Sequence, residues 1–270
     1  MAIRDLQAID IHAHYGKCIN GHSELMDEFM SGSAQTVVER AGLANTCLTV
    51  VSPLGAIRPK FRADAVAANE QAARVVEQAQ GLLQLVVINP LQPRTYQQAA
   101  RMLVAAKCVG IKIGPGAHGY QISKYGRDIF EFASEHQAVL LSHSGEQNCE
   151  PADFVPLADD YPQVKLILAH LGYAHDMDPS HQVRAIQASR AGNIFVDTSS
   201  SRSLTPGLIE WAVDQVGAER ILYGTDSPLY FAPSQRARID RAGVSDRQKE
   251  LILRDNAERL LGLQARLKSL

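Results

Sequence analysis

Residues 63–88 read ADAVAANEQAARVVEQAQGLLQLVVI, a helical pattern that leads directly into a strand pattern. Within 63–80, alanine, valine and glutamate recur at three- and four-residue spacing, which is typical of an amphipathic helix. Residues 83–88 form a short, mostly apolar run that is typical of a buried strand. Parallel strands need a crossover connection of this kind, usually a helix. The stretch therefore predicts one unit of a parallel α/β fold.

The same unit recurs along the whole chain. Strand patterns cover 8–13, 46–51, 83–88, 109–113, 138–142, 165–169, 193–197 and 220–224. Helical patterns cover 34–43, 63–80, 94–106, 127–137, 151–160, 180–190, 205–217 and 245–262, the last with Ser245 as its N-cap. Eight such units predict an α/β fold, a (β/α)8 TIM barrel, as a single domain over 1–270; such barrels commonly take about 250 residues.

Composition narrows the class of protein. The chain of 270 residues is 46% hydrophobic and 21% charged, as soluble globular proteins are. Its net charge of −2 argues against a nucleic-acid or membrane partner and favours a small-molecule substrate. We expect a cytoplasmic protein, because the sequence shows neither a leader pattern nor an apolar run of about 18 residues. Four dispersed cysteines predict thiols, not a disulfide framework: Cys18, Cys47, Cys108 and Cys149.

Polar side chains stand at the ends of several predicted strands, where the active sites of such barrels lie. They are Asp10, His12, His14, Lys112, His143, His170 and Asp226. Alone, Asp226 would be an ordinary helix N-cap and Lys112 a side chain that reaches solvent. Burying several imidazoles and a carboxylate together costs several kcal/mol unless a metal or a partner compensates. The set therefore predicts a divalent metal site, with Zn favoured over Mn or Fe.

The first strand contains three of these residues. Asp10, His12 and His14 are two apart, so their side chains are expected on one side of the strand. At about 3.3 Å per residue, Asp10 lies too low for the ion that the histidines reach. We therefore expect Asp10 to support the site and not to be a ligand.

The order of the motifs resembles the amidohydrolase superfamily, within its amidohydrolase-related branch of metal-dependent hydrolases and decarboxylases. The motifs are Asp10-Ile-His12-Ala-His14, Gly110-Ile-Lys112, Ser142-His143-Ser-Gly-Glu146, Leu168-Ala-His170-Leu-Gly172, Gly224-Thr-Asp226-Ser-Pro228 and Asn256-Ala-Glu-Arg-Leu-Leu-Gly262. Each motif is weak alone. Their combination in this order, over nearly the whole chain, is specific.

The resemblance implies roles for these positions. His12 and His14 match the pair that holds the more buried ion, and Asp226 completes that site. His143 matches the ligand on strand 5. His170 matches a second-metal ligand in two-metal members and a substrate-facing catalytic residue in one-metal members. Lys112 stands where some relatives have a carboxylated lysine, so one ion is favoured and two are expected if Lys112 is carboxylated. Barrels of this family often pair, which leaves a homodimer open.

Two reactions follow from that resemblance. The favoured one is hydrolysis of a small ester, lactone or amide by a metal-activated water, with Asp226 as the proton acceptor and His170 polarising the carbonyl. The alternative is decarboxylation of a small carboxylated, possibly aromatic, substrate, in which His170 moves the proton. A chain close to the minimal barrel length favours hydrolysis. Arg58, Lys60 and Arg62 after strand 2 suit the acidic substrate of a decarboxylase.

Two further stretches of the sequence contain polar or glycine-rich motifs. Residues 114–119 (GPGAHG) match the dinucleotide-binding G-x-G-x-x-G pattern, but no helical pattern begins directly after them. We interpret them as a flexible loop, with His118 and Tyr120 either touching substrate or lying on the surface. Residues 197–201 (DTSSS) are expected either to line the pocket with hydroxyls or to cap the next helix.

Overall fold

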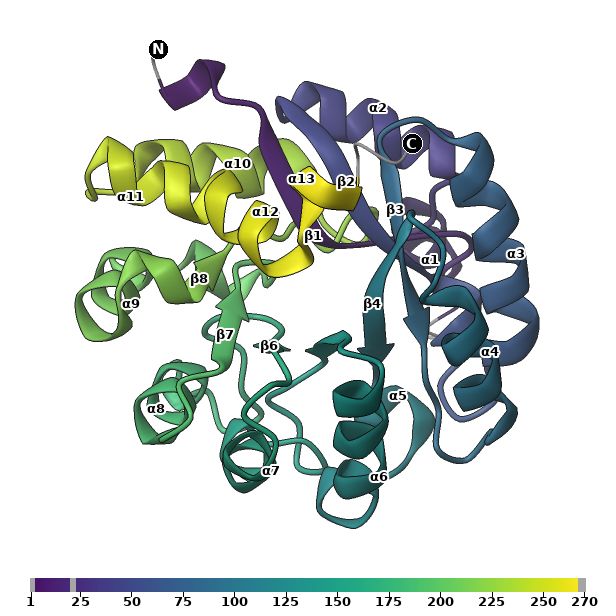
Figure 1. Ribbon diagram of the computed structural model, residues 1–270. Coiled ribbons are helices and arrows are strands. Elements are labelled where there is room, and N and C mark those ends of the chain that lie inside the picture. The colour runs from purple at the N-terminus through teal and green to yellow at the C-terminus, as the bar shows by residue number, and fades with distance from the viewer. Residues whose placement is uncertain (1–2, 20–22, 267–270) are drawn as a thin grey trace.

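Eight parallel strands form a barrel surrounded by helices in the computed structural model, which describes residues 3–19 and 23–266 (Figure 1). The strands are β1 (Ala8–Tyr15), β2 (Thr46–Pro53), β3 (Leu82–Val87), β4 (Cys108–Ile113), β5 (Val139–Ser142), β6 (Leu166–Leu168), β7 (Ile194–Asp197) and β8 (Ile221–Leu222). They are neighbours in sequence order. The predicted (β/α)8 barrel is confirmed.

The helices connect successive strands and cover the outside of the barrel (Figure 1). They are α1 (Glu24–Phe29), α2 (Ala34–Leu43), α3 (Ala65–Gln78), α4 (Arg94–Met102), α5 (Pro115–His118), α6 (Ile122–Glu135), α7 (Val155–Asp160), α8 (His181–Ala188), α9 (Leu208–Val216), α10 (Ala232–Arg241), α11 (Asp246–Glu250), α12 (Asn256–Leu261) and α13 (Leu263–Arg266). A π-helical turn, Leu251–Asp255, joins α11 to α12, so the predicted helix 245–262 is nearly continuous.

The barrel interior is a packed apolar core that α12 and α13 close at one end. Side chains of the strands, such as Leu83, Val109 and Ile167, pack with Ala257 and Leu261 in a single buried cluster. Figure 1 shows these last helices lying across the barrel. Because the described residues fill this end, we look for a ligand site at the other end, where the strands finish.

A register shift in β1 changes one expectation. Relative to β2, β1 has an extra residue between Asp10 and Ala13, the pattern of a β-bulge. Ile9 and Ile11 pack into the barrel core, yet His12 lines the ligand cavity described below. The simple alternation is thus broken, and the expectation that Asp10 shares a face with His12 is wrong.

The seam between β8 and β1 closes without a regular ladder among the described residues. Single backbone hydrogen bonds cross it instead, beginning with the N–H of Ile11, which donates to the carbonyl of Tyr223 at 3.0 Å. β8 is only two residues long, so most of these bonds are made by the segment that follows it.

The GPGAHG segment differs from the flexible loop that was predicted. Residues 115–118 form the short helix α5, and both His118 and Tyr120 are buried, at 5% and 3% exposure. Nε2 of His118 donates to the carbonyl of Ala56 at 2.8 Å. Neither residue lines the ligand cavity or the surface, so both interpretations of them are wrong. Gly116 packs so closely against the carboxylate of Glu146 that a Cβ there would overlap it unless the Glu146 side chain moved.

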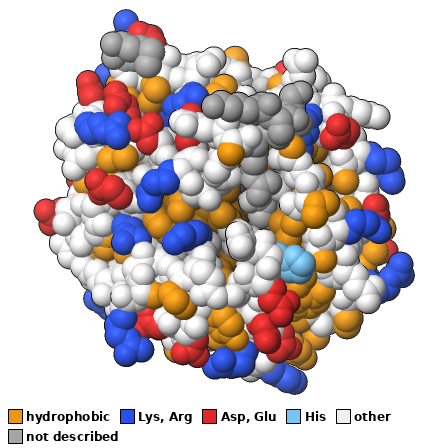
Figure 2. All heavy atoms as spheres, viewed as in Figure 1, with side chains coloured by type: hydrophobic (Ala, Val, Ile, Leu, Met, Phe, Trp, Pro, Cys, Tyr) orange, Lys and Arg blue, Asp and Glu red, His pale blue; other side chains and the backbone are white. Residues whose placement is uncertain are grey.

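In the view of Figure 2, acidic, basic and apolar side chains are interspersed. All four cysteines are thiols, as predicted. None of the helices in the described part of the chain has the length and apolar character of a membrane-spanning segment.

Candidate metal centre

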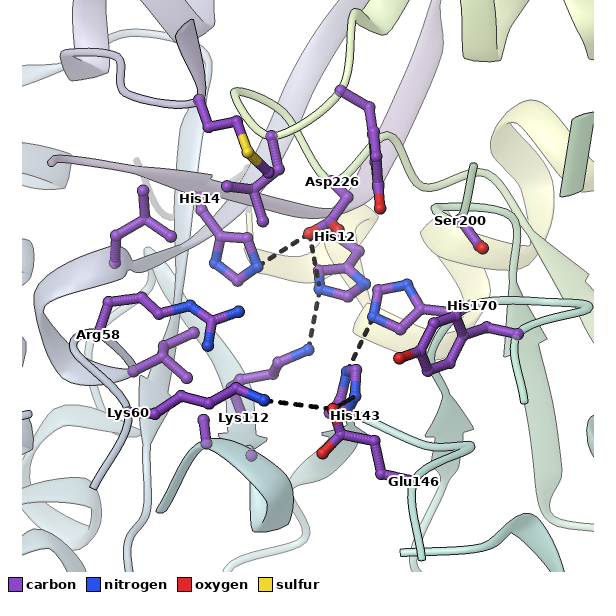
Figure 3. Close-up of a pocket in the computed structure, with 18 residues that line it drawn as sticks. His12, His14, Arg58, Lys60, Lys112, His143, Glu146, His170, Ser200 and Asp226 are labelled. Atoms are coloured by element: carbon purple, nitrogen blue, oxygen red, sulfur yellow. Dashed lines mark hydrogen bonds and ion pairs between the residues drawn. The ribbon is translucent and has the colours of Figure 1, made fainter. Parts of the chain in front are cut away.

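A cavity of about 240 Å³ lies at the carboxyl ends of the strands and collects the predicted site residues (Figure 3). The predicted residues that line it are His12, His14, Lys112, His143, His170 and Asp226. The sequence separates them by more than 200 positions, and only barrel closure brings them together.

Three donor atoms converge on the side of the cavity formed by β1 and the end of β8. Oδ1 of Asp226 lies 3.0 Å from Nε2 of His14 and 3.6 Å from Nε2 of His12. The donor atoms of these three residues all lie within 4.8 Å of one another, and all three side chains are buried. We call His12, His14 and Asp226 the ligand set.

The second ring nitrogen of each histidine has an acceptor that fixes the tautomer. Nδ1 of His12 donates to Oδ2 of Asp197 at 2.8 Å, and Nδ1 of His14 donates to the carbonyl of Ser52 at 3.0 Å. Both Nε2 atoms are thereby left as lone pairs that face Asp226, the arrangement that metal-binding histidines show. Two imidazoles and a carboxylate suit Zn²⁺, Mn²⁺ or Fe²⁺, so the set fits a divalent metal ion.

Asp226 is held in an uncommon backbone conformation, with φ at +55°. Burial by itself would raise the pKa of this carboxyl, but its contacts with the imidazoles of His14 and His12 lower it below its usual value. An ionised carboxylate is the form that binds a cation.

Asp197 is more important to the site than the sequence indicated. Its Oδ2 orients His12, while Oδ1 accepts the backbone N–H of His170 at 3.0 Å and that of Ser199 at 2.9 Å. Burial raises its pKa, yet the interactions with His12 lower it below its usual range. Of the pocket hydroxyls expected in 197–201, only that of Ser200 lines the cavity. Ser201 is the N-cap residue of the 3-10 helix Arg202–Leu204, without a side-chain hydrogen bond to it. The sequence signal that could have identified Asp197 is a carboxylate at the end of a buried strand.

His170 and His143 contact each other directly. Nε2 of His170 lies 3.0 Å from Nδ1 of His143, and Nδ1 of His170 lies 2.8 Å from Oγ of Ser199. Burial lowers the pKa of His170 well below its usual value. A second group of converging donors consists of His12, His170 and Asp197. His143 belongs to neither group among the described residues, so its role as a ligand stays a prediction.

Lys112, on β4, lines the cavity and is 3% exposed. Its Nζ is 2.9 Å from Nε2 of His12, and burial lowers the pKa of the amine to about 8. A lowered pKa makes a neutral amine more accessible, which carboxylation requires. Carboxylation of Lys112 stays a prediction.

The wall across from the ligand set is formed by Arg58, Lys60 and Glu146 (Figure 3). Oε1 of Glu146 is 3.5 Å from Nζ of Lys60 and 3.4 Å from Nε2 of His143. The contact with His143 lowers the pKa of Glu146 below its usual value. Nη1 of Arg58 is buried without a hydrogen-bond partner. Arg62, also expected to face an acidic substrate, does not line this cavity.

Fold and site together define a (β/α)8 barrel with a candidate divalent-metal centre. The chain belongs to the amidohydrolase family, whose model, described as Amidohydrolase, matches residues 9–263. No curated protein sequence matches the chain.

Solved structures share the fold across almost their whole length. The 2,6-dihydroxybenzoate decarboxylase from Rhizobium is 14% identical, with a TM-score of 0.75 over 96% of this chain and 99% of that one. A dihydroxybenzoic acid decarboxylase from a Polaromonas species, with bound manganese and the inhibitor 2-nitroresorcinol, is 15% identical, with a TM-score of 0.70 over 96% and 97%. A Staphylococcus aureus protein described as an amidohydrolase is 17% identical, with a TM-score of 0.72 over 96% and 100%.

Proposed function

We propose that the protein is a divalent-metal-dependent decarboxylase that removes CO2 from a small, hydroxylated aromatic carboxylate. This reverses the preference for hydrolysis that chain length gave. Structures named as decarboxylases of dihydroxybenzoate align with 96% of this chain, so a chain of this size accommodates such a site.

The charge of the cavity carries the proposal. Three cationic side chains line it, Arg58, Lys60 and Lys112, against the carboxylates of Asp226 and Glu146. A divalent ion at the ligand set would make the cavity strongly positive, which suits an anionic substrate and gives a neutral ester no advantage. The unpartnered Nη1 of Arg58 is a buried donor that a substrate carboxylate or phenolate would satisfy.

The size and walls of the cavity fit one substituted ring. Its volume of about 240 Å³ is below the roughly 300–1,000 Å³ of pockets for drug-sized ligands. Tyr173 and Tyr230 line it and offer aromatic surface and hydroxyl groups.

Decarboxylation breaks the bond between a ring carbon and its carboxylate, leaves the electron pair on the ring carbon, and places one proton there. A bound divalent ion would supply positive charge that holds the oxygens of the substrate. We assign the proton transfer to His170, which lines the cavity next to the ligand set and is oriented through Ser199. Arg58 and Lys60 bind the anionic substrate, and Asp226 belongs to the ligand set.

Hydrolysis of an ester, lactone or amide is the second candidate, because the ligand set also suits activation of water. In that reaction Asp226 would take the proton from the water and pass it to the leaving group.

The test follows both reactions in one protein preparation. Metal-free protein is loaded with Mn²⁺, or with Zn²⁺ in parallel, and supplied with 2,6-dihydroxybenzoate in D2O. The proposal predicts CO2 release that depends on the metal and one deuterium at the carbon that lost its carboxylate. Release of acid from a panel of aryl esters and lactones, without CO2 from the benzoate, would favour the hydrolase instead.

A further inference from the structure

The turn that presents Asp226 needs support from outside itself. Its φ of +55° lies in the left-handed region, which residues other than glycine seldom adopt and which persists only where surrounding contacts hold it. The two-residue strand β8 pairs with β7 over Val196 and Asp197 and ends before the turn begins. Regular strand pairing therefore does not hold residues 225–227.

The backbone of β1 supplies part of this support. The carbonyl of His12 accepts the N–H of Asp226 at 2.7 Å and that of Thr225 at 3.2 Å, and the N–H of His14 donates to the carbonyl of Ser227 at 2.6 Å. The two ligand-bearing segments are therefore bonded to each other directly across the seam where the barrel closes.

One buried side chain bridges the same seam. Oδ1 of Asp10 accepts the N–H of His12 at 3.0 Å and the N–H of Thr225 at 3.1 Å, so a single oxygen joins both segments. Oδ2 of Asp10 accepts the hydroxyl of Thr225 at 2.5 Å, and that hydroxyl accepts the N–H of Ser227 at 3.1 Å. Asp10 and Thr225 are 2% and 1% exposed.

We propose that Asp10 and Thr225 are positioning residues that set the metal affinity of the site. They fix the distance between the strand-1 histidines and Asp226, because their hydrogen bonds clamp the residue before Asp226 to the backbone of His12. The β-bulge in β1 turns Asp10 away from the ligand set and toward this seam. The inference rests on the metal site of the proposed function and not on which reaction that site performs.

Two substitutions of Thr225 separate the role of its hydroxyl from that of its methyl group. Replacing Thr225 with valine keeps the shape but removes the hydroxyl that bonds both Asp10 and Ser227. Serine keeps the hydroxyl and removes only a methyl group. A matched control is Thr95, fully buried, whose hydroxyl oxygen bonds the N–H and the carbonyl of Asn89 at 3.0 and 3.1 Å away from the cavity.

The experiment titrates metal-free protein with Mn²⁺ and follows the free ion by electron paramagnetic resonance. Thr225→Val should bind Mn²⁺ about 10–100-fold more weakly than wild type, as loss of an outer support typically does. Thr225→Ser should stay within about threefold of wild type, given the hydroxyl it keeps. Thr95→Val should bind as wild type does, although it loses a comparable buried hydroxyl.

Two outcomes overturn the inference. Wild-type affinity in folded Thr225→Val does so directly. If circular dichroism shows that this variant does not fold, Asp10→Asn decides, because asparagine keeps Oδ1 but has an amide nitrogen in place of Oδ2, the acceptor of the Thr225 hydroxyl; unchanged affinity there overturns the inference too. A wild-type protein that binds no Mn²⁺ refutes the proposed metal site itself, which is a different result from unaltered binding in the variants.

Discussion

The two sides of the cavity are built differently. In the ligand set, the side chains of His12, His14 and Asp226 are at most 7% exposed, and each histidine has its second nitrogen bonded to a buried or backbone acceptor. On the opposite wall, which we call the substrate wall, the side chains of Lys60 and Glu146 are 44% and 26% exposed and are joined by an ion pair.

This difference indicates that the two sides have different functions, metal binding and substrate binding. Breaking a buried hydrogen-bond network leaves unsatisfied groups, whereas an exposed ion pair is screened and contributes under about 1 kcal/mol. The ligand set is therefore rigid and the substrate wall adaptable. Changes to the ligand set should lower metal binding and turnover together, and changes to the substrate wall should alter substrate binding alone.

The largest effect is expected from Asp226→Asn. The amide cannot supply the anionic donor of the ligand set, so kcat should fall by about 10³-fold or more while the far-ultraviolet circular dichroism stays unchanged. Turnover and metal content measured on the same sample test this. A variant that keeps a near wild-type rate would remove Asp226 from the site.

Asp197→Asn should have the next largest effect. The asparagine no longer holds the Nδ1 proton of His12 with a charged oxygen, so Mn²⁺ affinity should fall by about 10–100-fold. Asp159→Asn is the matched control, because Asp159 also accepts a backbone N–H, from Ala191 at 3.0 Å, but does not line the cavity. Equal losses in the two variants would show a general effect on folding and not orientation of His12.

Arg58→Gln should weaken substrate binding and leave metal binding unchanged. Loss of one charged hydrogen bond, about 1.5 kcal/mol, corresponds to a rise in KM of about tenfold with Mn²⁺ affinity unchanged. Arg62→Gln, four residues further on and outside the cavity, is the control and should leave KM unaltered. If Arg58→Gln weakens Mn²⁺ binding instead, the division between the two sides is wrong.

The smallest effect is expected from Glu146→Gln. Its ion pair with Lys60 is partly exposed, so the free energy of unfolding should change by under about 1 kcal/mol, and less in high salt. Urea unfolding at two salt concentrations measures this. A loss of several kcal/mol would show that the substrate wall is as tightly built as the ligand set.

Much of the fold could be predicted because its signal is local and repeated. A switch from helical to strand periodicity, as at 63–88, occurs seven times along the chain, and parallel topology follows from the crossovers. The convergence of His12, His170 and Asp226 could be predicted as well, since the carboxyl ends of barrel strands meet at one face.

The remaining features depend on contacts that no local pattern encodes. The bulge that turns Asp10 away from His12 is a register shift against β2. Asp197 orients a histidine 185 positions away in the sequence, so its location after a strand could equally well indicate a cap. His118 is buried with its ring bonded to the carbonyl of Ala56, which belongs to the segment after a different strand.

Anomalous diffraction from crystals of the protein soaked in Mn²⁺ tests the central claim most directly. We predict a peak within about 2.0–2.3 Å of Nε2 of His12, Nε2 of His14 and Oδ1 of Asp226, the distances usual for such ligands. A fully soaked crystal with no peak there, or with its strongest peak elsewhere on the protein, would contradict the assignment of these three residues as the metal centre.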